Sequence, residues 1–220
     1  MKALAIFGST ARNERDFDSD IDMIGIYEGS IIKSVNHANV SLFLYPEKIL
    51  NEKMLSGDLF ALHLVKESIP IFGEEILSKI YSRFKYKDNY REEMDTSLML
   101  AFKILNLYEE LAVFNEANKK LVWSLRTFII SVSAQDRTPV FSKKLIAGYL
   151  KLLSINSESM LRLINMKSMK SKLPKCILNE FKSLFDELYV KFGSKHLLAN
   201  ELLINDIIDG IKGSDKLSDY

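Results

Sequence analysis

The hydrophobic pattern of the chain changes its period about a third of the way along, and this change constrains the fold more than any other feature. Residues 3–7, 21–27 and 40–45 are short apolar or alternating runs bounded by turn residues, which predicts three β-strands. From about Asp88 onward, apolar residues recur every three or four positions, as in helices with one buried face. The sequence therefore predicts an α/β (α+β) domain with a small mixed sheet at residues 1–86 and an all-α helical bundle at 87–220.

Turn and cap residues predict where the smaller elements begin and end. Residues 31–35 are a candidate fourth strand, joined to 40–45 by a polar hairpin at 36–39. We expect five or six helices in the second domain, the last over 195–211, and fraying of residues 213–220. The residues placed to begin, break or end helices are Pro46, Ser56, Gly73, the segment 135–139, Ser142, Pro174 and Gly193.

Composition argues against several classes of protein. Lys and Arg total 30 and Asp and Glu total 29, so a net charge of +1 disfavours a strongly basic nucleic-acid coat. The single cysteine, Cys176, can form neither an intramolecular disulfide nor a zinc cluster, which suits a reducing compartment. No apolar run approaches the roughly 18 residues of a membrane-spanning helix, and the N-terminus lacks a signal-peptide pattern. We therefore expect a cytoplasmic protein without a membrane partner.

One segment carries candidate chemistry: Phe7, Gly8 and Ser9, then ten intervening residues, then Asp20-Ile21-Asp22-Met23. Gly8 permits a tight turn after the first strand, and Ser9 would present its hydroxyl and amide at the start of a helix, where phosphate is favoured. Asp20 and Asp22 are two residues apart, so both carboxylates are expected on one face of the second strand, with Ile21 and Met23 toward the core. Paired carboxylates can hold a hard cation such as Mg²⁺ together with substrate phosphates.

At these residues the sequence resembles the nucleotidyltransferase superfamily related to DNA polymerase β, particularly its small bacterial members. The resemblance implies that Gly8, Ser9 and Arg12 bind a nucleoside triphosphate, most simply ATP. It also implies that Asp20 and Asp22 are the catalytic pair that binds Mg²⁺ or Mn²⁺. The implied reaction transfers a nucleoside monophosphate, most simply AMP, to a hydroxyl of a small molecule, a protein or an RNA.

The chain departs from the family pattern at a third carboxylate, which the family places on a later strand. The candidate strand at 40–45 carries Ser41 at the position with the right flanks. Three explanations stay open: reduced activity with one fully formed metal site, a carboxylate from elsewhere such as Glu47 or Asp58, or nucleotide binding without turnover.

The last explanation would make the chain a regulatory protein that acts through a partner. Small nucleotidyltransferases also occur in toxin–antitoxin systems with a helical ribonuclease, whose motif pairs Arg with a His four to six residues later. None of Arg91, Arg126, Arg137 and Arg162 has a His at that distance, so we do not expect the nuclease itself in this chain, and the antitoxin-like half stays open as an alternative. A protein partner and a homo-oligomer are both compatible with the sequence.

Simpler structural explanations compete with several of these assignments. The less favoured alternative for the motif is purely structural. In that case Gly8-Ser9 is an ordinary turn, and the two aspartates are the polar face of an edge strand. Arg12 is as readily a surface charge as a phosphate ligand, and His63 lies in an apolar helix where packing is the favoured role. Tyr108 and Trp123 fall on apolar helical stripes and are expected in the core. The stretch 162–175 contains five basic residues and no acidic one, which suits RNA, although a solvated helix face is the favoured interpretation.

Overall fold

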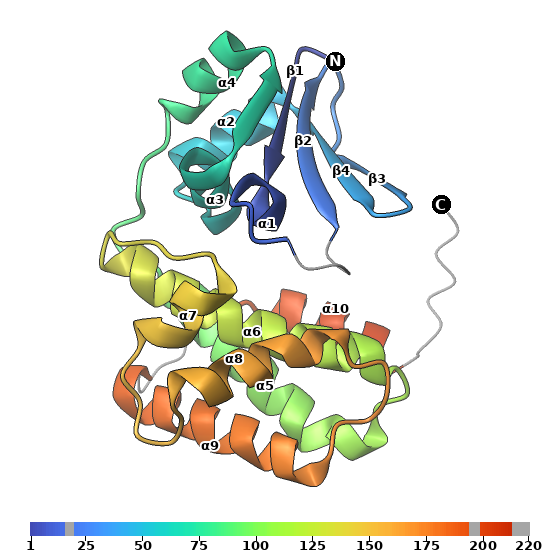
Figure 1. Ribbon diagram of the computed structural model, residues 1–220, viewed down its shortest axis with the longest axis vertical. Coiled ribbons are helices and arrows are strands. Elements are labelled where there is room, and N and C mark those ends of the chain that lie inside the picture. The colour runs from blue at the N-terminus through green and yellow to red at the C-terminus, as the bar shows by residue number, and fades with distance from the viewer. Residues whose placement is uncertain (16–19, 194–198, 213–220) are drawn as a thin grey trace. The chain divides into compact units, whose positions relative to one another are not determined.

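The computed structural model describes residues 1–15, 20–193 and 199–212. Contacts within the chain divide it into two units, Met1–Asp88 and Asn89–Tyr220, and each is described by itself (Figure 1). The boundary expected after residue 86 lies two residues before this division. The segment expected to fray, 213–220, and the expected helix start at Lys195 lie outside the described residues.

The N-terminal unit is built on a five-stranded sheet with the order β3-β4-β2-β1-β5 (Figure 1). Strands β1 (Ala3–Phe7), β2 (Ile21–Tyr27) and β4 (Val40–Pro46) lie where the sequence predicts them. β2 runs antiparallel to β1 and parallel to β4, so the sheet is mixed as expected. The expected hairpin is also present, since β3 (Lys33–His37) pairs antiparallel with β4. The strand lies two residues later than predicted, and the turn consists of residues 38–39, not 36–39.

Strand β5 (Ile69–Phe72) was not predicted from the sequence, which suggested only helices after residue 46. It pairs antiparallel with β1 at the edge of the sheet, with a bulge between Leu4 and Ala5. Proline is tolerated at a sheet edge, where its missing N–H costs no ladder hydrogen bond. Because proline is uncommon within strands, Pro70 made this short strand hard to predict. Its pairing also depends on β1, which is far away in the sequence.

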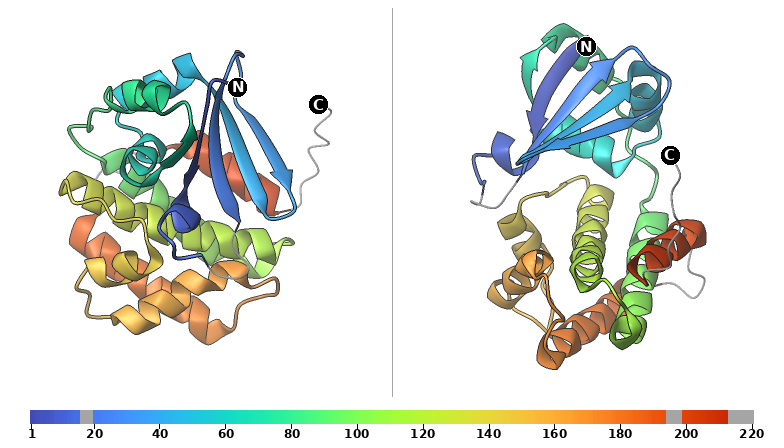
Figure 2. Two further views of the ribbon diagram at one scale, coloured as in Figure 1. Left: turned by 45° about the horizontal axis from the view of Figure 1, so that its top comes forward. Right: turned by 90° about the vertical axis from the view of Figure 1, so that its right-hand side faces the viewer.

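Helices α2 (Glu47–Leu55), α3 (Leu59–Glu67) and α4 (Glu74–Tyr81) cover one face of this sheet (Figures 1 and 2). The core between sheet and helices is made by small and large apolar side chains of both layers: Ala3, Ala5, Phe7, Ile24, Ile26, Tyr45, Leu50, Met54, Ala61, Leu64, Leu77 and Ile80. Because side chains alternate along a strand, Asp22 shares the helix-covered face with Ile24 and Ile26. It lies at the margin of the core, where β2 begins.

The expectation that Ile21 and Met23 point into the core is wrong. Ile24 and Ile26 are fully buried beneath the helices, whereas Ile21 and Met23 lie on the opposite face and are half-buried. β2 carries large apolar residues on both faces, so alternation alone did not decide which face the helices cover. The correction places the carboxylate of Asp22 on the same side of the sheet as the helices.

The residue that caps α3 differs from the one that the sequence suggested. Asp58, not Ser56, caps α3, and its Oδ1 accepts hydrogen bonds from the amides of Phe60 at 2.9 Å and Ala61 at 3.1 Å. Ser56 instead ends α2, where its hydroxyl donates to the carbonyl of Lys53. Aspartate and serine are both good caps, and Asp58 is the one that directly precedes the helix.

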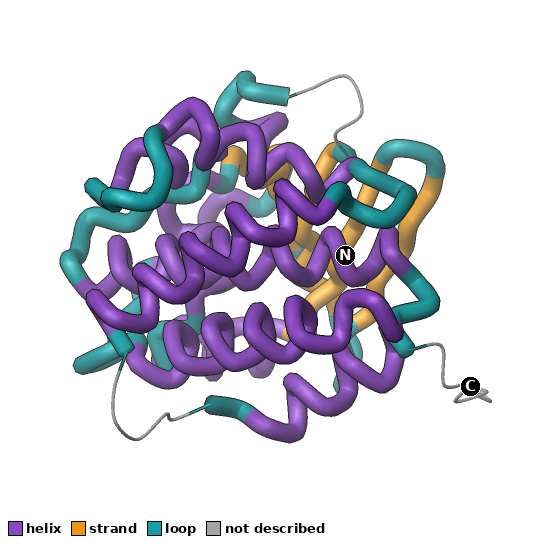
Figure 3. Tube along the Cα trace, turned by 90° about the horizontal axis from the view of Figure 1, so that it is seen from below, coloured by secondary structure: helices purple, strands orange, loops and turns teal. Residues whose placement is uncertain are grey.

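The described part of the C-terminal unit contains helices and no strand (Figure 3). The helices are α5 (Arg91–Leu107), α6 (Phe114–Gln135), α7 (Lys143–Tyr149), α8 (Ser157–Asn165), α9 (Lys175–Phe192) and α10 (Glu201–Ile211). α5 packs against α6, α9 and α10, and α7 packs against α8. Ser142 caps α7 and Pro174 precedes α9, as expected, and Gly193 follows the last residue of α9.

Among the helices described, none combines the length and the apolar character needed to cross a lipid bilayer.

Candidate functional site

Gly8 and Asp22 meet where β1 ends and β2 begins. Phe7, the last residue of β1, is the antiparallel partner of Asp22, and Gly8 follows with a left-handed φ of 70°. A Cβ added to Gly8 would lie 2.9 Å from Oδ2 of Asp22, so the carboxylate lies directly against the glycine backbone. Any other L-residue would force the two apart. The sequence motif thus brings its glycine and its second aspartate together in space.

Ser9 lies in the short helix α1 (Gly8–Ala11), which forms a tight turn. The carbonyl of Ser9 accepts a hydrogen bond from the amide of Glu14 at 2.9 Å, and Asn13 has a left-handed φ of 56°. The segment after β1 therefore folds back within a few residues. As expected, the motif is a strand, a glycine turn and a helical turn.

Ser41 is the direct parallel partner of Asp22 on β4, and Asn36 of β3 is in turn the partner of Ser41. Cα atoms on neighbouring strands are about 4.8 Å apart, so Ser41 occupies the position beside Asp22 on the same face. The row Phe7, Asp22, Ser41, Asn36 crosses four strands of the sheet. It contains one carboxylate.

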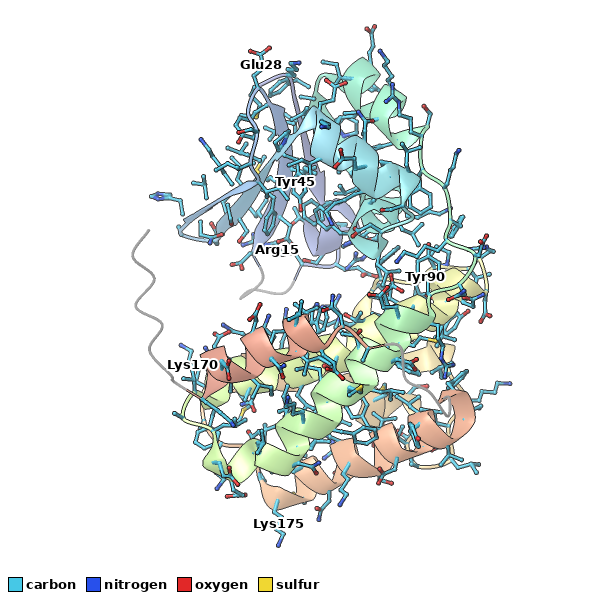
Figure 4. The ribbon with its side chains drawn as sticks, turned by 180° about the vertical axis from the view of Figure 1, so that it is seen from behind. Arg15, Glu28, Tyr45, Tyr90, Lys170 and Lys175 are labelled. Atoms are coloured by element: carbon cyan, nitrogen blue, oxygen red, sulfur yellow. The ribbon has the colours of Figure 1, made fainter. Side chains whose placement is uncertain are left out.

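Both alternative sources of a third carboxylate, Glu47 and Asp58, have other partners in the structure. Glu47 follows the far end of β4, and Ser41 is separated from Pro46, the last residue of that strand, by roughly 17 Å of extended chain. The carboxylate of Glu47 lies 3.7 Å from Lys2 Nζ, which also contacts Glu28. Figure 4 shows Glu28 and Arg15 at opposite ends of the sheet.

Asp58 is engaged in the cap of α3 and lies 2.8 Å from Lys53 Nζ. It is also close to Tyr45: burial raises the pKa of the Tyr45 hydroxyl, and the charge of Asp58 adds to that increase. Tyr45 pairs with Ile26, four residues beyond Asp22 along β2. Asp58 is therefore a structural residue that caps α3 and pairs with Lys53.

Asp20 lies immediately before β2 and is exposed. The sequence suggested that Asp20 and Asp22 both lie on the second strand, but only Asp22 lies within β2. The role of Asp20 as a second metal ligand stays a prediction. Asp16 and Asp18, which belong to the ten residues between Ser9 and Asp20 in the sequence, lie outside the described residues.

Arg12 forms ion pairs with two carboxylates. Its Nε donates to Glu14 Oε2 at 2.9 Å, and its Nη1 donates to Glu67 Oε2 at the end of α3. His63 Nε2 lies 2.6 Å from the same oxygen of Glu67, and the His63 ring packs edge-on against Phe7 with centroids 5.5 Å apart. His63 is thus packed beside the motif, as favoured. Sequence reasoning missed Glu67, whose only signal is its spacing of four residues from His63.

Of the two aromatic residues expected in the core of the second unit, one is buried there and the other is not. Tyr108 is 1% exposed and belongs to the core, whereas Trp123 is 39% exposed and does not. Trp123 lies on α6 next to buried Val122, and one residue of rotation moves a helical side chain by about 100°. The sequence interpretation was therefore wrong in assigning Trp123 to the buried face of α6.

The basic stretch 162–175 is partly neutralised by acidic residues outside it. Arg162 pairs with Glu180 on α9, and Lys172 pairs with Glu109. Figure 4 shows Lys170 and Lys175 at separate places on the surface of their unit. These contacts favour a solvated helix face over a continuous site for RNA.

Over the described ranges, no group of three or more His, Cys, Asp or Glu side chains is arranged to hold a metal ion. No protein-family model matches the chain, and no curated protein matches it.

Proposed function

We propose that the N-terminal unit binds a nucleoside triphosphate, most simply ATP, together with Mg²⁺ or Mn²⁺, and transfers its nucleoside monophosphate to a hydroxyl group. The observation that supports this is the carboxylate of Asp22 lying against the backbone of Gly8. An acidic side chain next to a glycine turn brings a cation ligand and a backbone segment without a side chain to one place. A triphosphate that carries a divalent cation needs both features.

The residues present fit a magnesium ion that keeps phosphate and water ligands. Asp22 and Asp20 supply carboxylate oxygens, the hard donors that Mg²⁺ prefers, and the chain would hold the ion through these two residues. When bound, the ion would neutralise negative charge on the phosphate oxygens. Gly8 and Ser9 would orient the triphosphate, and this positioning would supply much of the rate acceleration.

In the proposed reaction, the acceptor oxygen forms a bond to the α-phosphorus, and the bond from that phosphorus to the bridging oxygen breaks. Pyrophosphate leaves with the bond electrons, and the proton of the acceptor hydroxyl passes to water. The acceptor is a hydroxyl of a small molecule, a protein or an RNA. The low net charge, and the ion pairs that neutralise basic residues of the second unit, favour a small molecule or a protein over RNA as the acceptor.

A second candidate function is nucleotide binding without turnover, in a regulatory or antitoxin-like protein that acts through a protein partner. The observation that favours it is Ser41, the direct partner of Asp22. A serine hydroxyl cannot replace the charge of a carboxylate at a hard cation. Glu47 and Asp58 are engaged elsewhere, so a missing ligand on β4 has no evident substitute among the residues described here.

The test is label transfer by the full chain. The wild-type protein and Asp22→Asn are each incubated with ATP, CTP, GTP or UTP labelled at the α-phosphate, with Mg²⁺ or Mn²⁺ and a cell extract. We expect a labelled acceptor with the wild-type protein and none with Asp22→Asn. Binding of the labelled nucleotide without transfer would favour the regulatory candidate. Absence of both binding and transfer would contradict the two candidates alike.

A further inference from the structure

Glu67 holds two donors with one oxygen. It is the last residue of α3, and its Oε2 accepts a hydrogen bond from Arg12 Nη1 and lies 2.6 Å from His63 Nε2. The side chains of Glu67, Arg12 and His63 are only 11%, 17% and 20% exposed. A single carboxylate thus joins the turn after β1 to a helix that begins some fifty residues later.

This contact fixes the far end of the glycine turn. Arg12 directly follows α1, and its amide donates to the carbonyl of Gly8 at 3.2 Å. The start of the turn is fixed by the packing of Gly8 against Asp22. The turn that would carry the triphosphate is therefore held at one end by β2 and at the other by Glu67.

The pair between Arg12 and Glu67 should persist when an anion binds. Removing Arg12 would leave a largely buried carboxylate at the C-terminal end of α3, where the helix dipole disfavours negative charge. His63 alone would then have to compensate it. Arg12 therefore has little freedom to leave Glu67 for a phosphate. Its guanidinium has five N–H donors, of which Glu14 and Glu67 take one each, so others stay available to a ligand.

We propose that Glu67 is a positioning residue of the nucleotide site: it holds Arg12, and through Arg12 the turn at residues 8–12, in the orientation that binds the triphosphate. This inference rests on the proposed function for its ligand. The structural part of the inference is independent of the proposed function, because the fixed turn is a property of the ligand-free protein.

The structural part is tested by hydrogen exchange on the ligand-free full chain. Glu67→Gln keeps the size of the side chain and removes its charge, and it should speed exchange of the amides of residues 8–13. Glu75→Gln, on the exposed surface of α4, is the matched control and should leave them unchanged. Unchanged exchange in Glu67→Gln would overturn the inference, whatever the protein binds.

The functional part is tested by titrating the same proteins with ATP and Mg²⁺. We expect Glu67→Gln to bind at least about tenfold more weakly, the usual effect of removing a residue that orients a ligand-binding side chain. Glu67→Asp keeps the charge but shortens the reach, so it should bind weakly too. Tighter binding by Glu67→Gln, or wild-type binding by Glu67→Asp, would show that Glu67 acts only through its charge and would overturn the inference.

A double-mutant cycle separates positioning from a general loss of stability. If Glu67 acts through Arg12, Arg12→Ala and Glu67→Gln should together weaken binding no more than Arg12→Ala alone. Additive losses would contradict that link. A wild-type protein that binds no nucleotide, with fast exchange in Glu67→Gln, would overturn the proposed function and leave the positioning of the turn established.

Discussion

The carboxylate of Asp22 lies so close to Gly8 that a Cβ on the glycine would come within 2.9 Å of Oδ2. Gly8 also has a left-handed φ of 70°, a conformation that costs an L-residue about 1–2 kcal/mol. We therefore expect Gly8→Ala to lower the free energy of unfolding by at least about 1–2 kcal/mol, measured by urea denaturation, and to weaken binding of ATP with Mg²⁺.

Gly210 is the matched control for this substitution. It lies within α10, and an added Cβ would meet no atom within 4 Å. Because alanine favours helix over glycine by up to about 1 kcal/mol, Gly210→Ala should raise stability and leave nucleotide binding unchanged. Equal stability of Gly8→Ala and the wild-type protein would contradict the contact between Gly8 and Asp22.

Ser41→Asp tests whether a missing carboxylate limits the site. It would place a second acid directly beside Asp22, where like charges on neighbouring strands repel. We expect a lower melting temperature in EDTA and a gain in melting temperature with Mg²⁺ larger than in the wild-type protein. Ser41→Asn has a similar shape without the charge and should show neither change. An equal response of Asp and Asn variants to Mg²⁺ would argue against a cation site here.

Thr10 contains a buried hydroxyl, Oγ1, that has no hydrogen-bond partner among the residues that the structure describes. A buried polar group without a partner costs stability, so Thr10→Val should raise the free energy of unfolding by about 1 kcal/mol. Thr10→Ser keeps the hydroxyl and loses a methyl group, and it should not be stabilising. A loss of stability in Thr10→Val, measured by the same urea titration, would show that the hydroxyl is satisfied.

Glu187 connects α9 to the loop after α7 and should make stability depend on pH. Its two carboxylate oxygens each accept a hydrogen bond at 2.7 Å, from the amides of Leu153 and Ser154. Hydrogen bonding from Ser154, and then from Leu153, lowers the pKa of the Glu187 carboxyl below its ordinary value of 4.5. A lowered pKa means that the stabilisation is present above pH 4.5 and is lost as the pH falls through the folded-state value.

Glu187→Gln should therefore be less stable than the wild-type protein at pH 7, with a difference that shrinks in acid. The effect should be small, because solvent screens the group. Asp186→Asn, a neighbouring exposed carboxylate on the same helix, is the control. A difference between Glu187→Gln and wild type that stays constant from pH 7 to strongly acidic pH would contradict the role given to these hydrogen bonds.

The sequence was most informative where a local pattern and a local structure coincide. The strands at 3–7, 21–27 and 40–45 each have a run of β-type residues between turn signals, and all three are present. The glycine turn and the helical turn after the first strand were likewise predicted. Antiparallel pairing of two adjacent strands is a short-range event, so the sequence between them contains most of the information needed.

Features that depend on distant partners were not predicted. β5 forms because β1 offers it an edge, and Glu67 matters because Arg12 reaches it from a different part of the chain. The orientation of β2 was predicted the wrong way round because Ile21 and Ile24 are equally apolar. Packing of α2, α3 and α4 on one face decides between them, and that choice involves the whole unit.

The proposed function requires that Asp22 and Asp20 bind the cation of a nucleotide at the Gly8 turn. We would titrate the full chain with ATP, with and without Mg²⁺, for the wild-type protein, Asp20→Asn and Asp22→Asn, each checked for folding by circular dichroism. We predict binding by the wild-type protein that requires Mg²⁺ and is weakened at least about tenfold in both variants. Binding that is the same in all three proteins, or the same without Mg²⁺, would contradict the claim.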